Sequence, residues 1–366
     1  MKKLQILFLF TLILTLFQSC NNDESNTENN NPQDNMIPQL NTNPAIDISH
    51  NSVKSGGNTI TIGGSSIQSK GVVWSTSPNP TIALSTKTND GSGNSNFNSQ
   101  ISNLDSNTQY YIRAYATNSN GTGYGNQILF RTTFPPIIAG NGFIDIDGNN
   151  YSTLIINNKE WSSKNLAVKK YRNGDNIPQV QSPSEWANLT TGAWCYYNND
   201  SNNENYGILY NWYAVNDPRG LSPNGWHIPS DNEWWNLQQF LISAGYNFDG
   251  DINLFDSQGV NDKLGKAIAS TTFQQGTASP LIGSPANIPN TNNRSGFTAL
   301  GSGLRGSDGG FQWINKTERW WSTSTYTSNN QIYVKDRGIA GHLQYGLKNN
   351  GGSLRTSGYS VRLIKN

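Results

Sequence analysis

Tryptophan is distributed unevenly along this chain of 366 residues. Ten of its eleven tryptophans lie between Trp161 and Trp321, and the remaining one is Trp74. The indole ring is large and mostly apolar, so folded proteins use it either in a core or as a stacking surface for a ligand. This distribution predicts two domains of different character, with the aromatic-rich one second.

Composition and charge narrow the class of protein. Charged residues make up 13% of the chain, well below the roughly 25% of ordinary soluble domains. Such a composition favours β-rich, loop-rich extracellular folds. The formal net charge of +1 becomes −1 without Lys2 and Lys3. No basic field is available to attract nucleic acid, which excludes nucleic acid as a partner.

Residues 1–20 have the pattern of a lipoprotein signal peptide. Lys2 and Lys3 precede an apolar run over 4–17, which suits a signal-peptide core and is too short to span a bilayer. Cys20 follows where bacterial lipoproteins are cleaved and acylated, although Phe17 and Gln18 depart from the usual lipobox. The pattern predicts an acyl anchor, such as palmitate, at Cys20 and thereby a membrane as partner. A secreted protein with an incidental cysteine is the alternative.

The residues after Cys20 predict location and tethering. "NNDES" resembles the acidic export signal of Bacteroidetes-type surface lipoproteins, which implies an outer-membrane lipoprotein exposed at the cell surface. Residues 21–44 are polar and Asn-rich, and such a segment buries too little apolar surface to fold. They are predicted to form a disordered tether.

Residues 45–134 show short strands between turn signals. Apolar and polar residues alternate along 109–118, which places four residues on one face, namely Tyr110, Ile112, Ala114 and Ala116. Leu104 and Tyr110 have the spacing of the tyrosine corner of fibronectin type III domains. The segment resembles such modules and is predicted to be an all-β sandwich with a spacer or adhesion role.

Residues 135–140 are predicted to be a proline-marked linker, and 141–366 the second domain. That domain opens with a hairpin whose turn is Asp147-Gly148. Its one convincing helix runs from about Asp231 to Ala244, in the stretch "NGWHIPSDNEWWNL".

The start of this helix contains a histidine and two carboxylates, which invites a chemical interpretation. Ser230 and Glu233 fit a capping box, in which each side chain binds the backbone N–H of the other residue. Trp234, Leu237 and Leu241 follow as an apolar stripe. We interpret the stretch as a helix start; a metal or acid–base role for His227, Asp231 and Glu233 is the minor alternative.

Cysteine and histidine are too few for most metal or nucleophilic chemistry. Beyond Cys20 the chain has only Cys195, whose apolar, aromatic context predicts a buried, inert thiol. Three histidines, His50, His227 and His342, make a multi-histidine centre implausible, and no catalytic motif appears. We therefore predict no metal, no cofactor and no catalytic residue, although sequence spacing leaves paired carboxylates open.

Two Asp-rich loops raise the question of calcium. The loop at 249–260 begins like an EF-hand loop but has Leu254 where glycine is required and Val260 where the bidentate acid is required. The loop at 145–150 fails similarly. Calcium stays an open alternative that neither loop supports.

A glycine-rich loop at 303–313 combines Arg305 and Asp308 with nearby aromatic residues. Donors, acceptors and stacking surfaces together are typical of a ligand-binding patch. The predicted patch consists of Arg305, Asp308, Trp313, Trp320, Trp321 and Tyr326. Other aromatics that are candidates for stacking on sugars are Trp194, Trp212 and Tyr345. The alternatives are core packing of the rings and an Arg305–Asp308 pair that ties down the loop.

The second domain resembles a known family through motifs in a characteristic order. They are "VKKYRNGDNIP", "YGILYNWYAV", "PNGWHIPSDNEWWNL", "SGFTALGSGLRG", "RWWSTS" and "GYSVRLIK". Residues 141–366 are identified on these motifs as a Fibrobacter succinogenes major paralogous domain, a recurrent module of bacterial surface lipoproteins without a defined activity.

More distantly, "HIPSDNEW" and "GYSVR" are similar to motifs of the formylglycine-generating enzyme family. This resemblance implies an α+β, C-type-lectin-like fold. That family's chemistry needs paired cysteines, which this chain lacks, and the E-P-N or Q-P-D tripeptide of calcium-dependent lectins is absent.

Together these observations predict a multidomain, lipid-anchored surface protein. Its expected function is non-catalytic recognition of a glycan or surface protein through the second domain. A surface enzyme acting on polysaccharide or protein is one alternative, and a structural or adhesin component without a discrete ligand is the other.

Overall fold

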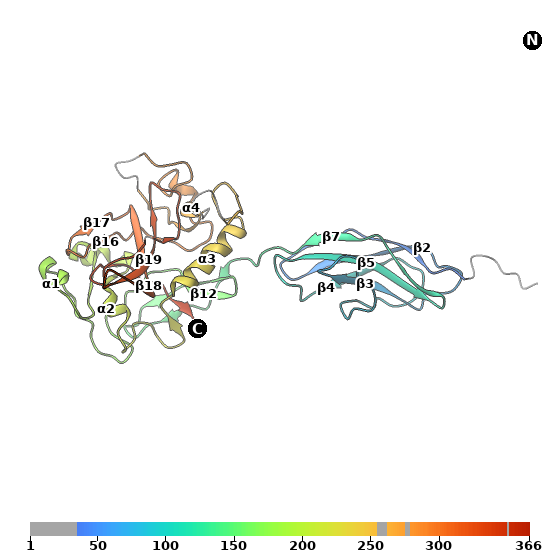
Figure 1. The fold of residues 1–366 in the computed structure, drawn as a ribbon, viewed down its shortest axis with the longest axis horizontal. Coiled ribbons are helices and arrows are strands. Elements are labelled where there is room, and N and C mark those ends of the chain that lie inside the picture. The colour runs from blue at the N-terminus through green and yellow to red at the C-terminus, as the bar shows by residue number, and fades with distance from the viewer. Residues whose placement is uncertain (1–34, 255–261, 275–278, 350) are drawn as a thin grey trace, which may run out of the picture. The chain divides into compact units, whose positions relative to one another are not determined.

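The computed structural model describes residues 35–254, 262–274, 279–349 and 351–366. Cys20 and the beginning of the predicted tether lie outside the described residues. The chain groups into two compact units (Figure 1). The first contains residues up to Ile46, Lys54–Gln100 and Tyr110–Phe130; the second contains Asp47–Val53, Ile101–Gln109 and Arg131–Asn366. None of the helices in the described ranges is long and apolar enough to span a bilayer.

The first unit is a β-sandwich, as predicted. One sheet has the order β1 (Gln39–Thr42), β2 (Val53–Thr61) and β4 (Phe97–Ile101). The other has β5 (Gln109–Asn118) paired with three strands: β3 (Ser69–Ser75), β6 (Gly121–Tyr124) and β7 (Ile128–Arg131). The pairings β1–β2, β3–β5 and β5–β6 are antiparallel.

The alternation read along β5 places its side chains as expected. The predicted inner residues are all buried, namely Tyr110, Ile112, Ala114 and Ala116. Tyr110 also stacks on Phe130, with 5.7 Å between ring centroids. Tyr115 falls on the opposite face in this alternation, yet it is buried too, and its hydroxyl donates to the Thr88 carbonyl at 2.6 Å.

Two predicted boundaries need correction. Residues 39–42, predicted to be tether, form β1, in which Leu40 and Thr42 are buried in the sandwich. Residues 138–139, predicted to be linker, form β8 (Ile138–Ala139), which pairs with β11 (Thr153–Ile156). Both strands are short, and neighbouring strands supply their hydrogen bonds, so a local pattern does not reveal them.

The second unit is built on a five-stranded sheet and several hairpins. The sheet order is β15 (Trp226–His227), β21 (Ile364–Lys365), β12 (Lys159–Ser162), β11 (Thr153–Ile156) and β8. The predicted hairpin is β9 (Phe143–Ile144) and β10 (Asn150–Tyr151), and Gly148 in its turn has a φ of +86°. Two further strand pairs are β13 (Trp194–Cys195) with β14 (Leu209–Tyr210), and β16 (Leu304–Arg305) with β17 (Phe311–Gln312).

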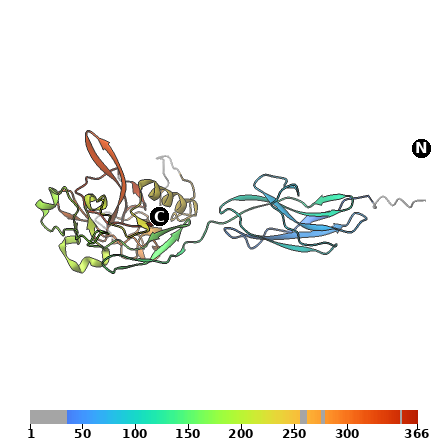
Figure 2. The same ribbon diagram turned by 90° about the horizontal axis from the view of Figure 1, so that it is seen from below.

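The longest hairpin joins β18 (Thr317–Ser328) to β19 (Gln331–Ala340). Figure 2 shows its tip projecting from the second unit. The base of β19 also pairs with β20 (Lys348–Asn349). The buried parts of both strands pack against helix α3 (Asp231–Ser243).

Helices are few and mostly short. The long one is α3 (Asp231–Ser243), and its predicted capping box is present, with Ser230 and Glu233 each bonding the other's backbone N–H. The others are α1 (Pro183–Ala187), α2 (Trp212–Val215) and α4 (Gly265–Ile268). Three short 3-10 segments complete the helices of the described ranges: Tyr197–Asn199, Ser201–Tyr206 and Pro289–Thr291. The predicted C-type-lectin-like fold stays a prediction.

The aromatic core of the second unit accounts for most of its tryptophans. Eight of the ten are at most 8% exposed, namely Trp161, Trp186, Trp194, Trp212, Trp226, Trp234, Trp320 and Trp321. The stripe of α3 is buried as predicted, and Trp234 stacks on Trp320 with 5.6 Å between centroids. Only Trp235 and Trp313 among the ten have substantial contact with solvent.

Candidate ligand-binding groove

The predicted patch around Arg305 does not exist as one surface. Arg305, Trp320 and Trp321 are all 0% exposed, so none of them can contact a ligand on this structure. The prediction was wrong for these three residues, because it treated a glycine-rich loop as exposed. Asp308, Trp313 and Tyr326 do lie at the surface, with Trp313 51% and Tyr326 36% exposed.

Arg305 is a structural residue of the interior. Its guanidinium donates to the carbonyls of Gly309, Val180 and Gln181 at 2.9, 2.7 and 2.8 Å. It also lies 4.2 Å from the ring centroid of Trp186. Arg305 therefore ties the β16–β17 turn to residues 180–181, and it does so through carbonyls rather than through Asp308. Asp308 instead accepts the backbone N–H of Gly310 at 3.0 Å.

Trp320 and Trp321 lie on opposite faces of β18 and both are hydrogen-bonded inside the protein. Trp320 donates its indole N–H to the Asn165 side chain at 3.1 Å, and Trp321 donates to the Tyr210 carbonyl at 2.7 Å. Trp194 and Trp212, the other candidates for sugar stacking, are also buried. Core packing is thus the role of these four rings.

In both Asp-rich loops, aspartate carboxylates form hydrogen bonds or ion pairs with other groups of the protein. Asp145 accepts from the backbone N–H groups of Asp147 and Asn149 and from the Tyr151 hydroxyl. In the other loop, Lys263 places its ammonium 2.7 Å from Asp249. A lysine ammonium thus lies beside Asp249, the first carboxylate of the EF-hand-like loop. Residues 255–260 of that loop lie outside the described residues.

The residues that opened the chemical question at the helix start contact one another. His227 Nε2 lies 2.8 Å from Glu233 Oε1, and His227 Nδ1 lies 2.7 Å from Asn366 Oδ1. Burial opposes ionisation of Glu233, but hydrogen bonds from Ser230 and His227 lower the pKa of its carboxyl. Across the ranges that the structure describes, no three His, Cys, Asp or Glu side chains gather as a metal site.

Cys195 is buried, as predicted. Its environment raises the pKa of the thiol to about 12 because burial disfavours the thiolate, although the nearby Arg305 guanidinium acts in the opposite direction. At neutral pH the residue is therefore a protonated, enclosed thiol, without the properties of a nucleophile.

A groove lies beside the first turn of α3, where the sequence predicted only a helix start. One part of it is a cavity of about 460 Å³ between α3 and the β18–β19 hairpin, lined by Asp231, Asn232, Trp235, Ser324, Lys335, Arg337 and Asn349. A second part, of about 290 Å³, adds Gln238, Asp262, Tyr345 and Lys348. Trp235, Arg337 and Asn349 line both parts, so the two lie side by side. We call this the Trp235 groove.

Arg337 forms the floor of the Trp235 groove and is 3% exposed. Its guanidinium bonds to Asp231 through Nε at 2.8 Å and through Nη2 at 2.5 Å, and to Gln238 and the Leu347 carbonyl at 3.1 Å each. Lys335 forms a second ion pair with Asp231 at 3.0 Å. These contacts fix the helix start on β19 and leave Arg337 without an N–H for a ligand.

The groups that a ligand can reach lie around this floor. Trp235 is half-buried and offers an indole surface on the side of α3 away from the core stripe. Exposed Asn232 and half-buried Asn349 contribute amides, and Lys335 contributes an ammonium. In the second part, the Lys348 ammonium lies 4.5 Å from the centroid of the Tyr345 ring. Apolar faces beside amides and cations suit a ring-shaped polar ligand.

Asp262 is the one buried carboxyl at the groove. Burial raises its pKa, yet its oxygens accept N–H donors from Gln238, Leu264, Gly346 and Leu347. Every one of these groups can only donate, so they hold the carboxylate in place and occupy its lone pairs. Asp262 therefore fixes the 262–264 and 346–347 backbones to α3.

Sequence reasoning missed the groove although a signal was present. Trp234 belongs to the buried stripe at helical spacing, and the next residue, Trp235, points about 100° away from it. A second tryptophan off the stripe cannot reach the same core, so "WW" in a capped helix indicates one buried and one outward indole. The partners of Trp235 come from β18, β19 and β20, more than 80 residues later, and no local pattern connects them.

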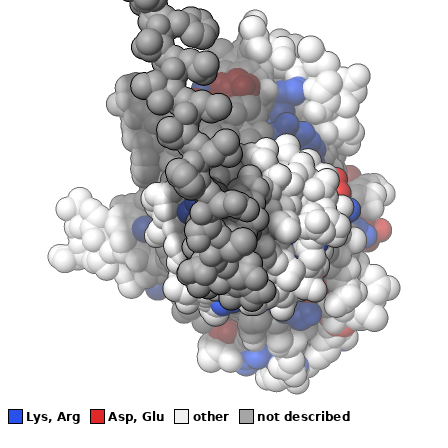
Figure 3. Space-filling model, turned by 90° about the vertical axis from the view of Figure 1, so that its right-hand side faces the viewer, with Lys and Arg blue, Asp and Glu red and all other residues white. Residues whose placement is uncertain are grey.

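The chain as a whole has few charged residues, 13% of its sequence. The face in Figure 3 shows scattered Lys and Arg among Asp, Glu and a majority of uncharged residues. This agrees with the low charged fraction of the sequence, and recognition in the Trp235 groove would depend on local contacts more than on long-range attraction.

Three of the solved structures that match the chain each cover less than a third of it. One is a titin fragment of domains A168–A170, with 20% identity and a TM-score of 0.20, covering 27% of this chain and 32% of that one. The chain thus spans about a third of the titin fragment. The sensor domain of the anti-sigma factor RsgI4 from Pseudobacteroides cellulosolvens has 17% identity, a TM-score of 0.22 and coverages of 27% and 96%. A fibronectin type III domain of the human KIAA0970 protein has 15% identity, a TM-score of 0.20 and coverages of 29% and 79%.

No curated protein matches the chain. A family model does, and it spans residues 154–365, more than half of the sequence. The match covers α3, the β18–β19 hairpin and every residue of the Trp235 groove. This chain belongs to the Fibrobacter succinogenes major domain family.

Proposed function

We propose that this chain is a cell-surface protein that binds a glycan in the Trp235 groove without acting on it chemically. The observation that carries the proposal is Trp235 itself. None of the other nine tryptophans of the second unit offers an indole surface in the groove: eight are buried in the core, and Trp313 is exposed but outside the groove. A half-buried indole in a groove leaves apolar area in water that a ligand would cover.

The chemistry around Trp235 fits a sugar ring. The C–H face of a pyranose stacks on an indole, while its hydroxyl groups exchange hydrogen bonds with amides such as those of Asn232 and Asn349. Lys335 and Lys348 favour a sugar that carries a carboxylate, such as a uronic acid. The preferred ligand class is therefore an acidic polysaccharide, and a surface protein is the competing ligand.

Two features support binding over catalysis. The carboxylate of Asp262 has its lone pairs committed to N–H donors, and Asp231 is held by Lys335 and Arg337. Neither is free to transfer a proton or to attack a substrate.

We also propose that acylation of Cys20 anchors the chain to the outer membrane. The β-sandwich, as a fibronectin-III-like module, would then act as a spacer, and the second unit, as a C-type-lectin-like module, would carry the binding site. These assignments rest on the signal-peptide pattern, on the resemblance of the sequence motifs and on the position of the Trp235 groove in the family domain.

The test is a glycan array probed with the full chain and with Trp235→Ala. We expect binding to acidic polysaccharide, weakened about tenfold or more by the substitution because a stacked aromatic anchor is lost. Trp313→Ala is the matched control, since Trp313 is an exposed tryptophan outside the groove, and it should bind normally.

The outcomes separate the alternatives. Binding to matrix proteins but to no glycan would favour a surface-protein ligand, and product release from a hit would favour an enzyme. The proposal fails if Trp235→Ala binds like the unmodified chain, or if no glycan binds at high protein concentration.

A further inference from the structure

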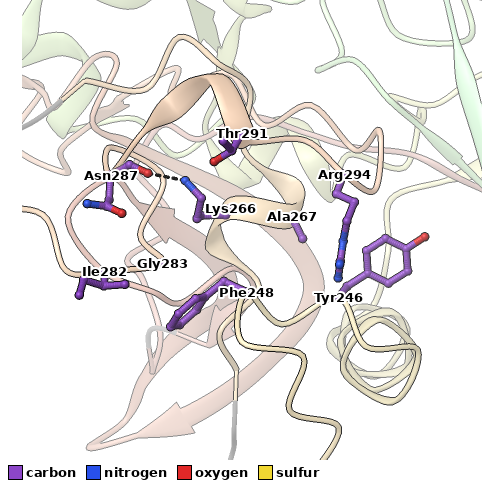
Figure 4. A pocket seen from close by; sticks show the side chains of 9 residues that line it. All are labelled: Tyr246, Phe248, Lys266, Ala267, Ile282, Gly283, Asn287, Thr291 and Arg294. Atoms are coloured by element: carbon purple, nitrogen blue, oxygen red, sulfur yellow. Dashed lines mark hydrogen bonds between the residues drawn. The ribbon is translucent and has the colours of Figure 1, made fainter.

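A second cavity, of about 330 Å³, lies beside α4 and has no part in the Trp235 groove. Figure 4 shows Lys266 near the middle of its lining, with Arg294 and Tyr246 on one side and Phe248 and Ile282 on the other. The arrangement places two cations and two aromatic rings around one space. Its volume falls in the lower range of small-molecule sites.

Lys266 has no acidic partner in the described part of the chain. Its ammonium donates to the carbonyls of Asn287 and Ile288, the latter at 3.0 Å. Partial burial lowers the pKa of Lys266, and no carboxylate opposes this effect. A bound anion would stabilise the charged ammonium, whose hydration is reduced by partial burial.

Arg294 is likewise compensated only by neutral groups among the residues described. Its guanidinium donates to the Gly245 carbonyl and lies 4.9 Å from the ring centroid of Tyr246. The cavity thus carries two positive charges, and the described residues that line it include no Asp or Glu. An anion entering it meets attraction from both cations and no acidic side chain.

The opposite side of the cavity is apolar. Phe248 lies flat against Gly283, where a Cβ would come 2.2 Å from the ring. Ile282 at the rim is 75% exposed, and the adjacent Leu281 is 52% exposed. These exposed aliphatic side chains contrast with the enclosed ones of the core, and Ile282 gives the rim of the cavity an apolar surface that a ligand could cover.

We propose that this cavity binds a small-molecule carboxylate with an aliphatic tail, the carboxylate at Lys266 and the tail along Phe248 and Ile282. Arg294 adds attraction and orients the anionic end. A plain inorganic anion would leave the apolar side uncovered, and an uncharged amphiphile would leave the two cations uncompensated. This site is independent of glycan binding in the Trp235 groove.

The test is calorimetric titration of the full chain with octanoate. We expect saturable one-to-one binding and no comparable binding of octan-1-ol, octylamine or inorganic phosphate. Lys266→Gln and Arg294→Gln should each weaken octanoate binding about tenfold, the loss expected for one charge-assisted contact. Lys159→Gln removes an exposed lysine of β12 that does not line the cavity, and it should bind octanoate normally.

Lys266→Gln removes two hydrogen bonds to the 287–288 backbone as well as a charge, so a second variant is needed that does not touch the fold. Ile282→Gln is that variant. Its side chain is largely exposed, and losing the aliphatic contact should weaken octanoate while leaving the melting temperature unchanged. The proposal is overturned if octanoate does not bind, if octan-1-ol or phosphate binds equally well, or if all three variants bind octanoate normally.

Discussion

At the scale of single residues, Arg305 is buried although its sequence neighbourhood suggests an exposed position. Trp235 is accessible to solvent although its neighbourhood suggests a purely structural role. Arg305 lies among glycines, where the chain looks exposed, yet it is enclosed by carbonyls and aromatic rings. Trp235 lies in a helix that looks purely structural, yet it faces a groove. Burial of a loop residue depends on segments distant in sequence, here residues 180–181, so composition around the residue does not determine it.

Arg305→Lys should destabilise the second unit by about 2 kcal/mol or more, because one ammonium cannot serve three carbonyls placed for a planar guanidinium. The measurement is urea unfolding followed by tryptophan fluorescence, which reports mainly on the second unit because ten of the eleven tryptophans lie there.

Arg219→Lys is the matched control for this experiment. Arg219 pairs with Asp217 and Asp175 at the surface, with 40% of its side chain exposed, so its replacement should leave the unfolding midpoint nearly unchanged. Equal midpoints for Arg305→Lys and the unmodified chain would contradict the structural role assigned to Arg305.

At the scale of elements, local sequence patterns were sufficient to predict an element whose stabilising contacts lie within the element itself. The capping box, the stripe of α3 and the Asp147-Gly148 hairpin turn all involve residues within a few positions of each other, and all three are confirmed. β1 and β8 were missed because their stability comes from pairing with β2 and β11. Short strands of this kind carry almost no pattern of their own.

Ser230→Ala should cost about 1 kcal/mol of stability, since it removes the acceptor for the Glu233 backbone N–H at the start of α3. Thermal unfolding followed by tryptophan fluorescence measures it. Ser243→Ala, at the other end of the same helix, should be neutral or slightly stabilising because alanine is the better helix former. A larger loss at Ser243 than at Ser230 would exclude the cap as the cause.

At the scale of the whole molecule, the order of motifs was more informative than their individual chemistry. The family, the β-sandwich and the aromatic core were all foreseeable, because each depends on a pattern spread over many residues. The Trp235 groove was not foreseeable from the sequence, since it assembles residues 231–238 with Asp262 and residues 324–349. Distance along the chain gives no information about such proximity.

Cys20→Ser should abolish acylation and release the protein from membranes, because the acyl chains would supply the affinity for the bilayer. Metabolic labelling with an alkyne analogue of palmitate, followed by membrane fractionation, measures both effects. Cys195→Ser is the matched control, since the only other cysteine is buried in the second unit and should not carry the label. Label retained in Cys20→Ser would contradict the proposed anchor.

The position of β21 constrains how the second unit is made. This strand lies between β15 and β12 in the sheet, and the preceding Arg362 bonds the carbonyls of Ser162, Phe297 and Thr298. Both neighbours of β21 precede it along the chain, so neither has this pairing until β21 has been synthesised. Until then β12 and β15 have no strand between them, and the five-stranded sheet closes only when β21 joins them. The sheet of the second unit is therefore assembled from segments far apart in sequence, and its closure depends on the strand that is synthesised after its other four.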